Sequence, residues 1–305
     1  MKSKNGKTGF KIVLIAFFAN LSVAIFKFIV AFITGSSSLF SEAIHSVADT
    51  SNQVFLFLGM KSRKKKEDLK HPFGYGQEEF FWAFMAAIQI FLLGGIFSIY
   101  RSYEKLKNPE KMEMVYLAFI IIIFSIVAES ISLAKTFKEI KKITGSGNIR
   151  SISKFLKDSW HVELIVVFLE DISAISGLIV AFISIGLSYL LENPIFDILG
   201  SFIIGAILIT TSFILGKEMK SLIIDESAPP EIVEEIEKIL LESEDVKKII
   251  SIKSIILGVN QIFVAIKLHL DEKIPTKEIP KKIKSLEDKI KNRCEEIKSI
   301  FIEPN

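Results

Sequence analysis

Residues 36–53, reading SSSLFSEAIHSVADTSNQ, place ionisable groups at helical spacing inside a segment long and apolar enough to enter a membrane. His45 and Asp49 are four residues apart, so a helix puts them on one face with Cβ atoms roughly 6 Å apart. On a soluble helix such a pair is most often solvated, but an Asp in the middle of a membrane span costs roughly 2.5–3.5 kcal/mol. That cost favours a functional role, and one divalent cation could contact both side chains.

The composition around this stretch is that of a membrane protein. Half of the 305 residues are hydrophobic, with 26 Phe against 8 Pro, and the net charge is only +3. The single cysteine, Cys294, excludes an intramolecular disulfide and fits a reduced, cytosolic face. We interpret the basic start MKSKNGK and the apolar run after it as a retained first span, because no small-residue cleavage site follows.

Six apolar stretches approach or exceed the roughly 20 residues that a bilayer crossing requires. They are residues 10–33, 38–60, 80–100, 115–134, 164–191 and 195–215. Basic residues concentrate in alternate loops, with four in residues 2–11, six in 61–77 and seven in 135–157. This bias and the even number of spans predict a multi-pass protein with both termini in the cytoplasm.

The composition changes after residue 216. Residues 217–305 contain no span-length apolar run and carry 16 basic and 18 acidic side chains, a balance that argues against a nucleic-acid binder. Helical and alternating patterns occur in the order α, β, β, α, β. We therefore predict a transmembrane domain of residues 1–216 and a compact, two-layer α/β domain of residues 217–305, with its helices on one face of a small sheet.

Other ionisable side chains fall within the predicted spans. Asp171 lies about a third of the way into the fifth span, and we favour it as a partner of His45 and Asp49. Glu170 is about 100° round the helix, so only one of the two should point squarely at the same site. For three more residues a structural role is favoured. Lys27 is expected to extend its ammonium group toward the outer surface. Glu163 and Asp197 lie near the ends of their predicted spans.

Imidazole nitrogen with carboxylate oxygens suits a borderline or hard divalent cation such as Zn²⁺, Fe²⁺ or Mn²⁺. The same groups bind protons, so the two cations compete, and a site open to alternate sides could exchange metal for protons. A second candidate is the pair Asp68 and His71 in the basic loop, although an exposed pair three residues apart more often holds no metal. The tail offers only His269 and Cys294 as soft ligands, so we expect a metal-free packing or dimerisation module there.

The chain resembles the cation diffusion facilitator family of zinc and related divalent-metal transporters. The resemblance rests on GSSSLFSEAIHSVADTSNQ, KSRKKKEDLKHPFGYGQEE, FLEDISAISG and IIDESAPPE, and it covers essentially the whole chain. It implies a homodimer of six-span subunits, each with a cytoplasmic ferredoxin-like domain, that exports divalent cations such as Zn²⁺ from the cytoplasm in exchange for protons. It implies no prosthetic group and no enzymatic activity. The Ile-rich and Lys-rich composition, with the short termini, favours a prokaryotic inner or plasma membrane.

The family's transport site usually combines two ligands four apart on the second span with two four apart on the fifth. His45 and Asp49 match the first pair, and Asp171 matches one member of the second. Val167 occupies the remaining position and cannot coordinate metal; Leu169-Glu170-Asp171 is similar to a subgroup that lacks the fifth-span His.

The fourth ligand is therefore open, with Glu170 or water considered first and Glu129 next. Asp68 and His71 match two members of a second family site, where Tyr75 stands in place of a frequent His. The alternative to transport is a membrane sensor or scaffold that keeps the fold, an alternative motivated by Val167. A hydrolase is a weaker third possibility, because no nucleophile constellation is evident.

Overall fold

The computed structural model describes the backbone of residues 3–305 and the side chains of residues 17–305 except residue 19. The chain divides into two compact units. The helical unit comprises residues up to 58, 82–153 and 163–217, and the tail unit comprises residues 59–81, 154–162 and 218–305. We describe each unit separately.

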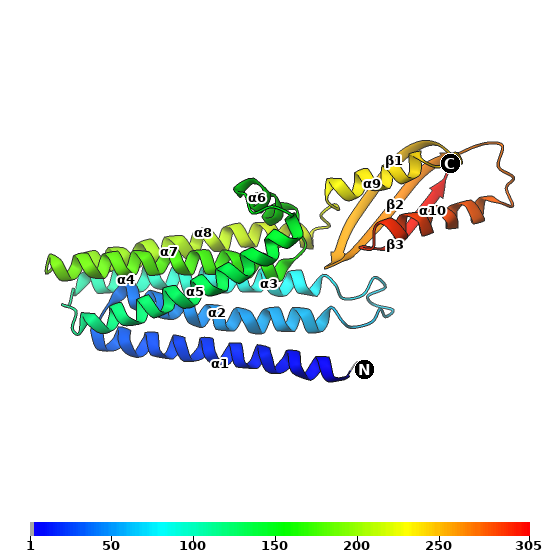
Figure 1. Cartoon of the computed structure of the whole chain (residues 1–305). Helices are drawn as coiled ribbons and strands as arrows, with labels where there is room; N and C mark the ends of the chain where they lie inside the picture. Colours follow the sequence, from blue (N-terminus) through cyan, green and yellow to red (C-terminus); the bar gives the residue numbers. More distant parts are fainter. Residues whose placement is uncertain (1–2) are drawn as a thin grey trace. The chain divides into compact units, whose positions relative to one another are not determined.

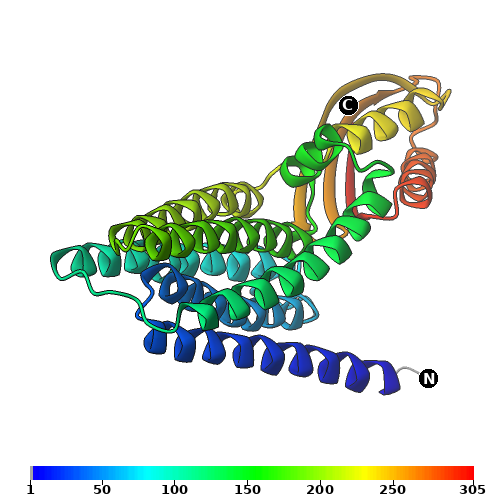
Figure 2. The ribbon, with the colours of Figure 1, turned by 60° about the vertical axis from the view of Figure 1, so that its left-hand side comes forward.

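Long helices make up the helical unit and lie alongside one another in both views (Figures 1 and 2). From the start of the described residues to residue 223, the helices in chain order are α1 (Ser3–Thr34), α2 (Ser37–Ser62), α3 (Glu78–Gln89), η1 (Ile90–Ile96), α4 (Phe97–Lys107), α5 (Val115–Thr144), α6 (Ile149–Asp158), α7 (Val162–Leu190) and α8 (Ile195–Ile223), and α6 is divided between the two units. The segments α3, η1 and α4 are continuous, and η1 has π-helical geometry. The sequence predicts only a basic loop between the fourth and fifth spans, whereas the structure has the short helix α6 there.

Four helices in the described part of the chain are long and apolar enough to cross a membrane. They are Glu78–Lys107, Val115–Thr144, Val162–Leu190 and Ile195–Ile223, and they contain most of each of the predicted spans three to six. Residues 10–16 of the first predicted span, and the basic residues of 2–11, lie outside the residues whose side chains are described. The 26-residue helix α2 is less apolar because it carries most of the polar stretch of residues 36–53. The full count of six spans stays a prediction.

Small residues allow close packing between the third and last apolar helices. A Cβ atom on Gly94 would lie 3.0 Å from Leu208 Cδ1, and one on Gly205 would lie 2.8 Å from Ile99 Cγ1. Small side chains let helix backbones approach within a membrane, where apolar burial alone does not drive association. These glycines therefore fix how α8 packs against the α3–η1–α4 helix.

The carboxylate of Asp197 joins the beginnings of two helices. Asp197 lies in the first turn of α8, and its Oδ1 accepts hydrogen bonds from Ser36 Oγ at 2.8 Å and from the Ser38 amide at 3.2 Å. The Ser37 amide donates to the other carboxylate oxygen. A negative charge at a helix N-terminus satisfies free amides and interacts favourably with the helix dipole. The structural role predicted for Asp197 is therefore that of an inter-helix cap.

The tail contains the predicted order of elements: α9 (Pro230–Leu241), β1 (Val246–Gly258), β2 (Gln261–Leu270), α10 (Ile279–Arg293) and β3 (Ile297–Pro304). β2 lies in the centre of the sheet, antiparallel to β1 and parallel to β3. Alternate β2 side chains, from Ile262 to Leu268, are buried. α9 contacts β1, α10 contacts β3, and the two helices contact each other, so both cover one face of the sheet (Figure 1). The predicted fold class, a helical membrane protein with an α/β tail, is confirmed.

Two segments from between predicted spans pack within the tail unit. The rings of Phe73 and Phe263 lie 5.5 Å apart, and Trp160 Nε1 donates to Asn260 Oδ1 at 3.1 Å. Gly76 meets Gly258 at the end of β1, backbone against backbone. We predicted a tail domain that begins at residue 217; in the structure residues 59–81 and 154–162 belong to the same compact unit. Where an independently folding tail begins stays a prediction.

We expect Gly258→Ala to loosen this packing. A Cβ atom on Gly258 would lie 2.8 Å from the Gly76 Cα, closer than two carbon atoms can approach without a backbone shift. Overpacking of this kind typically costs about 1–3 kcal/mol. Amide hydrogen exchange of the full chain should show faster exchange in residues 59–81. Gly186→Ala is the control, since its Cβ would meet Phe119 Cζ at an ordinary 3.8 Å; equal exchange in both variants would contradict the packing described.

Candidate metal transport site

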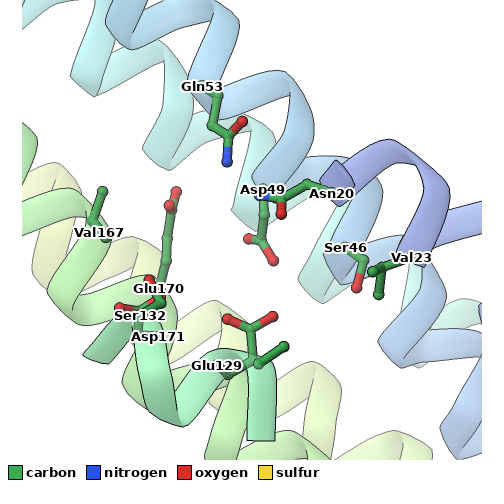
Figure 3. A pocket seen from close by; sticks show the side chains of 11 residues that line it. Asn20, Val23, Ser46, Asp49, Gln53, Glu129, Ser132, Val167, Glu170 and Asp171 are labelled. Atoms are coloured by element: carbon green, nitrogen blue, oxygen red, sulfur yellow. The ribbon is translucent and has the colours of Figure 1, made fainter. Parts of the chain in front are cut away.

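A cavity of about 130 Å³ lies inside the helical unit between α1, α2, α5 and α7 (Figure 3). The liquid volume of one water is roughly 30 Å³, so the cavity can hold a cation together with a few waters. Its polar lining consists of Asn20, Ser46, Asp49, Gln53, Glu129, Ser132, Glu170 and Asp171. Four of these side chains are carboxylates, and none of the described side chains that line the cavity is basic. Such a site attracts cations and disfavours anions.

Helical spacing brings the carboxylates to the cavity from three elements. Asp49 is on α2, Glu129 on α5, and Glu170 and Asp171 on α7. The carboxylates of Asp49 and Glu129 point toward each other, whereas Glu170 extends from another side (Figure 3). Glu170 and Asp171 both line the cavity, although we expected only one of these neighbours to face the site.

His45 lies beside the cavity rather than on its lining. Its Nδ1 is 3.2 Å from Asp49 Oδ1, and the side chain is only 1% exposed. Neither ring nitrogen has a hydrogen-bond partner among the described residues, so the short approach to Asp49 is a contact without hydrogen-bond alignment. Buried polar atoms without partners are uncommon and often mark a binding role. The imidazole is therefore free to take a ligand next to Asp49.

The two acidic residues of α7 differ in their hydrogen bonding. Asn52 Nδ2 donates to Glu170 Oε1 at 2.5 Å and ties α7 to α2. Asp171 lines the same cavity beside Ser132 of α5, and its Oδ2 has no hydrogen-bond partner in the described part of the chain. Asp171 thus keeps one acceptor atom open, whereas Glu170 is held by an amide.

The structure brings the predicted ligands into one region, but their side chains are not arranged to coordinate a single metal ion. Across the described residues, no three His, Cys, Asp or Glu side chains lie close enough together to hold one metal ion. Asp49, Glu170 and Asp171 line the cavity. His45 does not line the cavity but contacts Asp49. Coordination of a single ion by three of them therefore requires side-chain or helix movement.

Val167 lines the same cavity, four residues before Asp171, and leaves that part of the wall apolar. Glu129 supplies a carboxylate that we had considered only after Glu170 and water. Gln53 also lines the cavity; its spacing of four from Asp49 and eight from His45 could have identified it in the sequence. Asn52 could not be recognised in this way, because its role depends on the approach of α7.

The second candidate pair, Asp68 and His71, lies on an exposed loop of the tail unit. Asp68 Oδ2 accepts a hydrogen bond from Tyr75 Oη at 2.6 Å, and Oδ1 accepts from the His71 amide at 2.7 Å. These hydrogen bonds, that of Tyr75 first, lower the pKa of Asp68 to about 2. His71 Nδ1 lies 3.3 Å from Oδ1. A metal would have to displace these donors, and binding at this pair stays a prediction.

Comparisons with known proteins identify the family of the chain. Residues 13–224 match the model of the cation efflux transmembrane domain, and residues 228–305 match that of the cation efflux protein cytoplasmic domain. The chain belongs to the cation diffusion facilitator family. Membership confirms the predicted resemblance and a multi-pass membrane protein, and it supports a transporter rather than an enzyme.

Two named relatives are matched by this chain over different shares of their own length. The chain is 30% identical over 268 residues to the mouse (Mus musculus) proton-coupled zinc antiporter SLC30A9, mitochondrial, covering 88% of this chain and 47% of that protein. It is 25% identical over 307 residues to the manganese efflux system protein MneP of Bacillus subtilis (strain 168), covering 100% of this chain and 98% of that protein. This chain spans about half the length of the mouse relative.

Proposed function

We propose that this protein exports divalent metal cations across a membrane in exchange for protons, by alternating access to the carboxylate cavity. The observation that carries the proposal is the convergence of Asp49, Glu129, Glu170 and Asp171 on one cavity inside the helical unit. Charged side chains within membrane helices are costly and face pathways or cavities. The names of the mouse and Bacillus relatives, a zinc antiporter and a manganese efflux protein, support the same class of cargo.

The proposed ligands are His45, Asp49 and Asp171, with Glu170 completing the set. One imidazole and several carboxylates suit Zn²⁺ and also the harder Mn²⁺, Fe²⁺ and Co²⁺. Each carboxylate binds either a proton or the metal, so arrival of metal on one side releases protons, and arrival of protons on the other side releases metal. This competition couples the two fluxes once the cavity opens to alternate sides.

The proposal extends to the arrangement in the membrane. We infer six spans, counting α1 and α2, and both termini in the cytoplasm, as the distribution of basic residues predicts. We infer a homodimer through the tail, whose family model describes the cytoplasmic domain of cation efflux proteins. The inner or plasma membrane remains our proposed location; the name of the mouse relative places that protein in mitochondria.

Uptake by purified protein in liposomes tests this function. With an imposed pH gradient, we expect Zn²⁺ or Mn²⁺ to accumulate inside vesicles that are initially acidic, with release of internal protons, and we expect no accumulation when the gradient is collapsed. The competing cations Fe²⁺, Cd²⁺ and Co²⁺, measured on the same preparation, would rank the cargo. Metal binding without accumulation would instead support the sensor or scaffold reading.

A further inference from the structure

A buried cation lies one side chain away from the transport cavity. Lys27 of α1 is 1% exposed, and its Nζ donates to Ser46 Oγ at 2.8 Å and lies 3.4 Å from Glu42 Oε2. We expected this ammonium to extend toward the outer surface; instead it points between helices and binds two residues of α2. An ammonium group loses its hydration there, and only a charged or polar partner makes that burial tolerable.

The partner carboxylate occupies a space that a glycine provides. Glu42 is 0% exposed, and its Oε1 has no hydrogen-bond partner among the described residues. That oxygen lies against Gly177 of α7, where any Cβ atom would collide with it. The ion pair therefore belongs to the packing of α1, α2 and α7, and one oxygen of Glu42 remains available.

Ser46 connects the ion pair to the cavity. Its hydroxyl receives the Lys27 hydrogen bond, and the same residue lines the cavity one helical turn before Asp49. Only the Ser46 side chain therefore separates the ammonium group of Lys27 from the cavity that Asp49 and Glu129 line. In a medium of low effective dielectric constant, a positive charge next to the cavity opposes the binding of a second cation inside it.

We propose that Lys27 is a resident counter-cation that sets how tightly the cavity holds its cargo. This inference rests on the proposed function. Several carboxylates around a small cavity would bind a divalent cation tightly and release it slowly, and a transporter needs release. The fixed charge of Lys27 weakens binding, and Glu42 holds Lys27 beside the cavity rather than inside it. Lys27 is a positioning residue in this scheme and does not contact the metal.

Opposite effects of two neutralising substitutions test the proposal. Lys27→Gln removes the positive charge and leaves Glu42 uncompensated, so we expect the Kd for Zn²⁺ and Mn²⁺ to fall about tenfold or more. The apparent KM for transport should fall with it, and the maximal rate should fall as release slows. Glu42→Gln leaves Lys27 uncompensated, so the Kd should rise. Binding is measured by equilibrium dialysis of the full-length protein, and transport in liposomes.

Three further variants make the result decisive. Lys27→Arg keeps the charge and should restore the wild-type Kd, and the double variant Lys27→Gln with Glu42→Gln should lie between the two single variants. Arg63→Gln is the matched control, because Arg63 pairs with the buried Glu79 at 2.7 Å in the tail unit and does not line the cavity. We expect its Kd to be unchanged.

A purely structural ion pair predicts a different pattern. Both single variants would then weaken binding together or leave the Kd unchanged, and either result overturns the inference. Should Lys27→Gln not fold, a double variant with a Kd equal to that of Glu42→Gln would overturn it as well. Wild-type protein that binds metal without transporting it would refute the proposed function alone. Wild-type protein that binds neither Zn²⁺ nor Mn²⁺ would refute both the proposed function and the role of Lys27.

Discussion

Replacing Asp49 with asparagine is expected to abolish metal-driven proton flux in reconstituted vesicles. The amide keeps the size of the side chain but removes the charge that faces Glu129 across the cavity and contacts His45 (Figure 3). Loss of a group that only supports a metal ligand costs 10–100-fold, so loss of the ligand itself should lower flux by at least about a hundredfold. His45→Ala should have the same effect, since it removes the imidazole beside the carboxylate.

The measurement is proton release from vesicles on addition of Zn²⁺ or Mn²⁺, with folding and dimerisation checked by gel filtration. Ser51→Ala is a suitable control on the same helix, because its hydroxyl bonds back to the Val47 carbonyl at 3.0 Å and does not line the cavity. Normal flux in both the Asp49 and His45 variants would end the export proposal.

Introducing histidine at position 167 is expected to change which metal the protein prefers. Val167 lines the cavity four residues before Asp171, so an imidazole there would share a helix face with that carboxylate. Imidazole favours Zn²⁺, whereas oxygen ligands suit Mn²⁺. We expect Val167→His to raise the ratio of Zn²⁺ to Mn²⁺ uptake about tenfold, the change that 1.4 kcal/mol of added binding would give.

Competition between the two metals in one vesicle preparation measures this ratio. Val167→Leu enlarges the side chain without adding a ligand and controls for lost cavity volume. If histidine and leucine alter the ratio equally, position 167 does not face the bound cation. That outcome would move the missing ligand elsewhere and strengthen the case for Glu129 or Glu170.

Much of the fold is predictable because periodicity and length are local properties of the sequence. Alternation of apolar residues identified β2 and placed the β1–β2 turn within a residue of its position. Helix ends were less accurate: α5 continues to Thr144, ten residues beyond the predicted span, because charged residues can extend a helix past the apolar core. The amphipathic helix α6 was missed because its ten residues were counted only as loop charge.

The candidate site was partly predictable for the same reason. The spacing of His45 and Asp49 is a property of one helix, and the structure places the two in contact. The prominence of Glu129, the tie between Asn52 and Glu170, and the burial of Lys27 depend on contacts between separate helices. No single-helix pattern reveals that Gly177 makes room for Glu42. Such pairings require the packed structure.

The carboxylate of Asp197 gives α2 a pivot. Its hydrogen bonds hold the Ser36–Ser38 end of α2 against α8, and Asp49 lies twelve residues further along. At 1.5 Å per residue this is a lever arm of about 18 Å, so a tilt of about 10° would carry the Asp49 side chain about 3 Å sideways. A small tilt of α2 about this hydrogen-bonded end is therefore enough to move Asp49 by a distance comparable to that between a metal ion and its ligands, while the contact with α8 is kept.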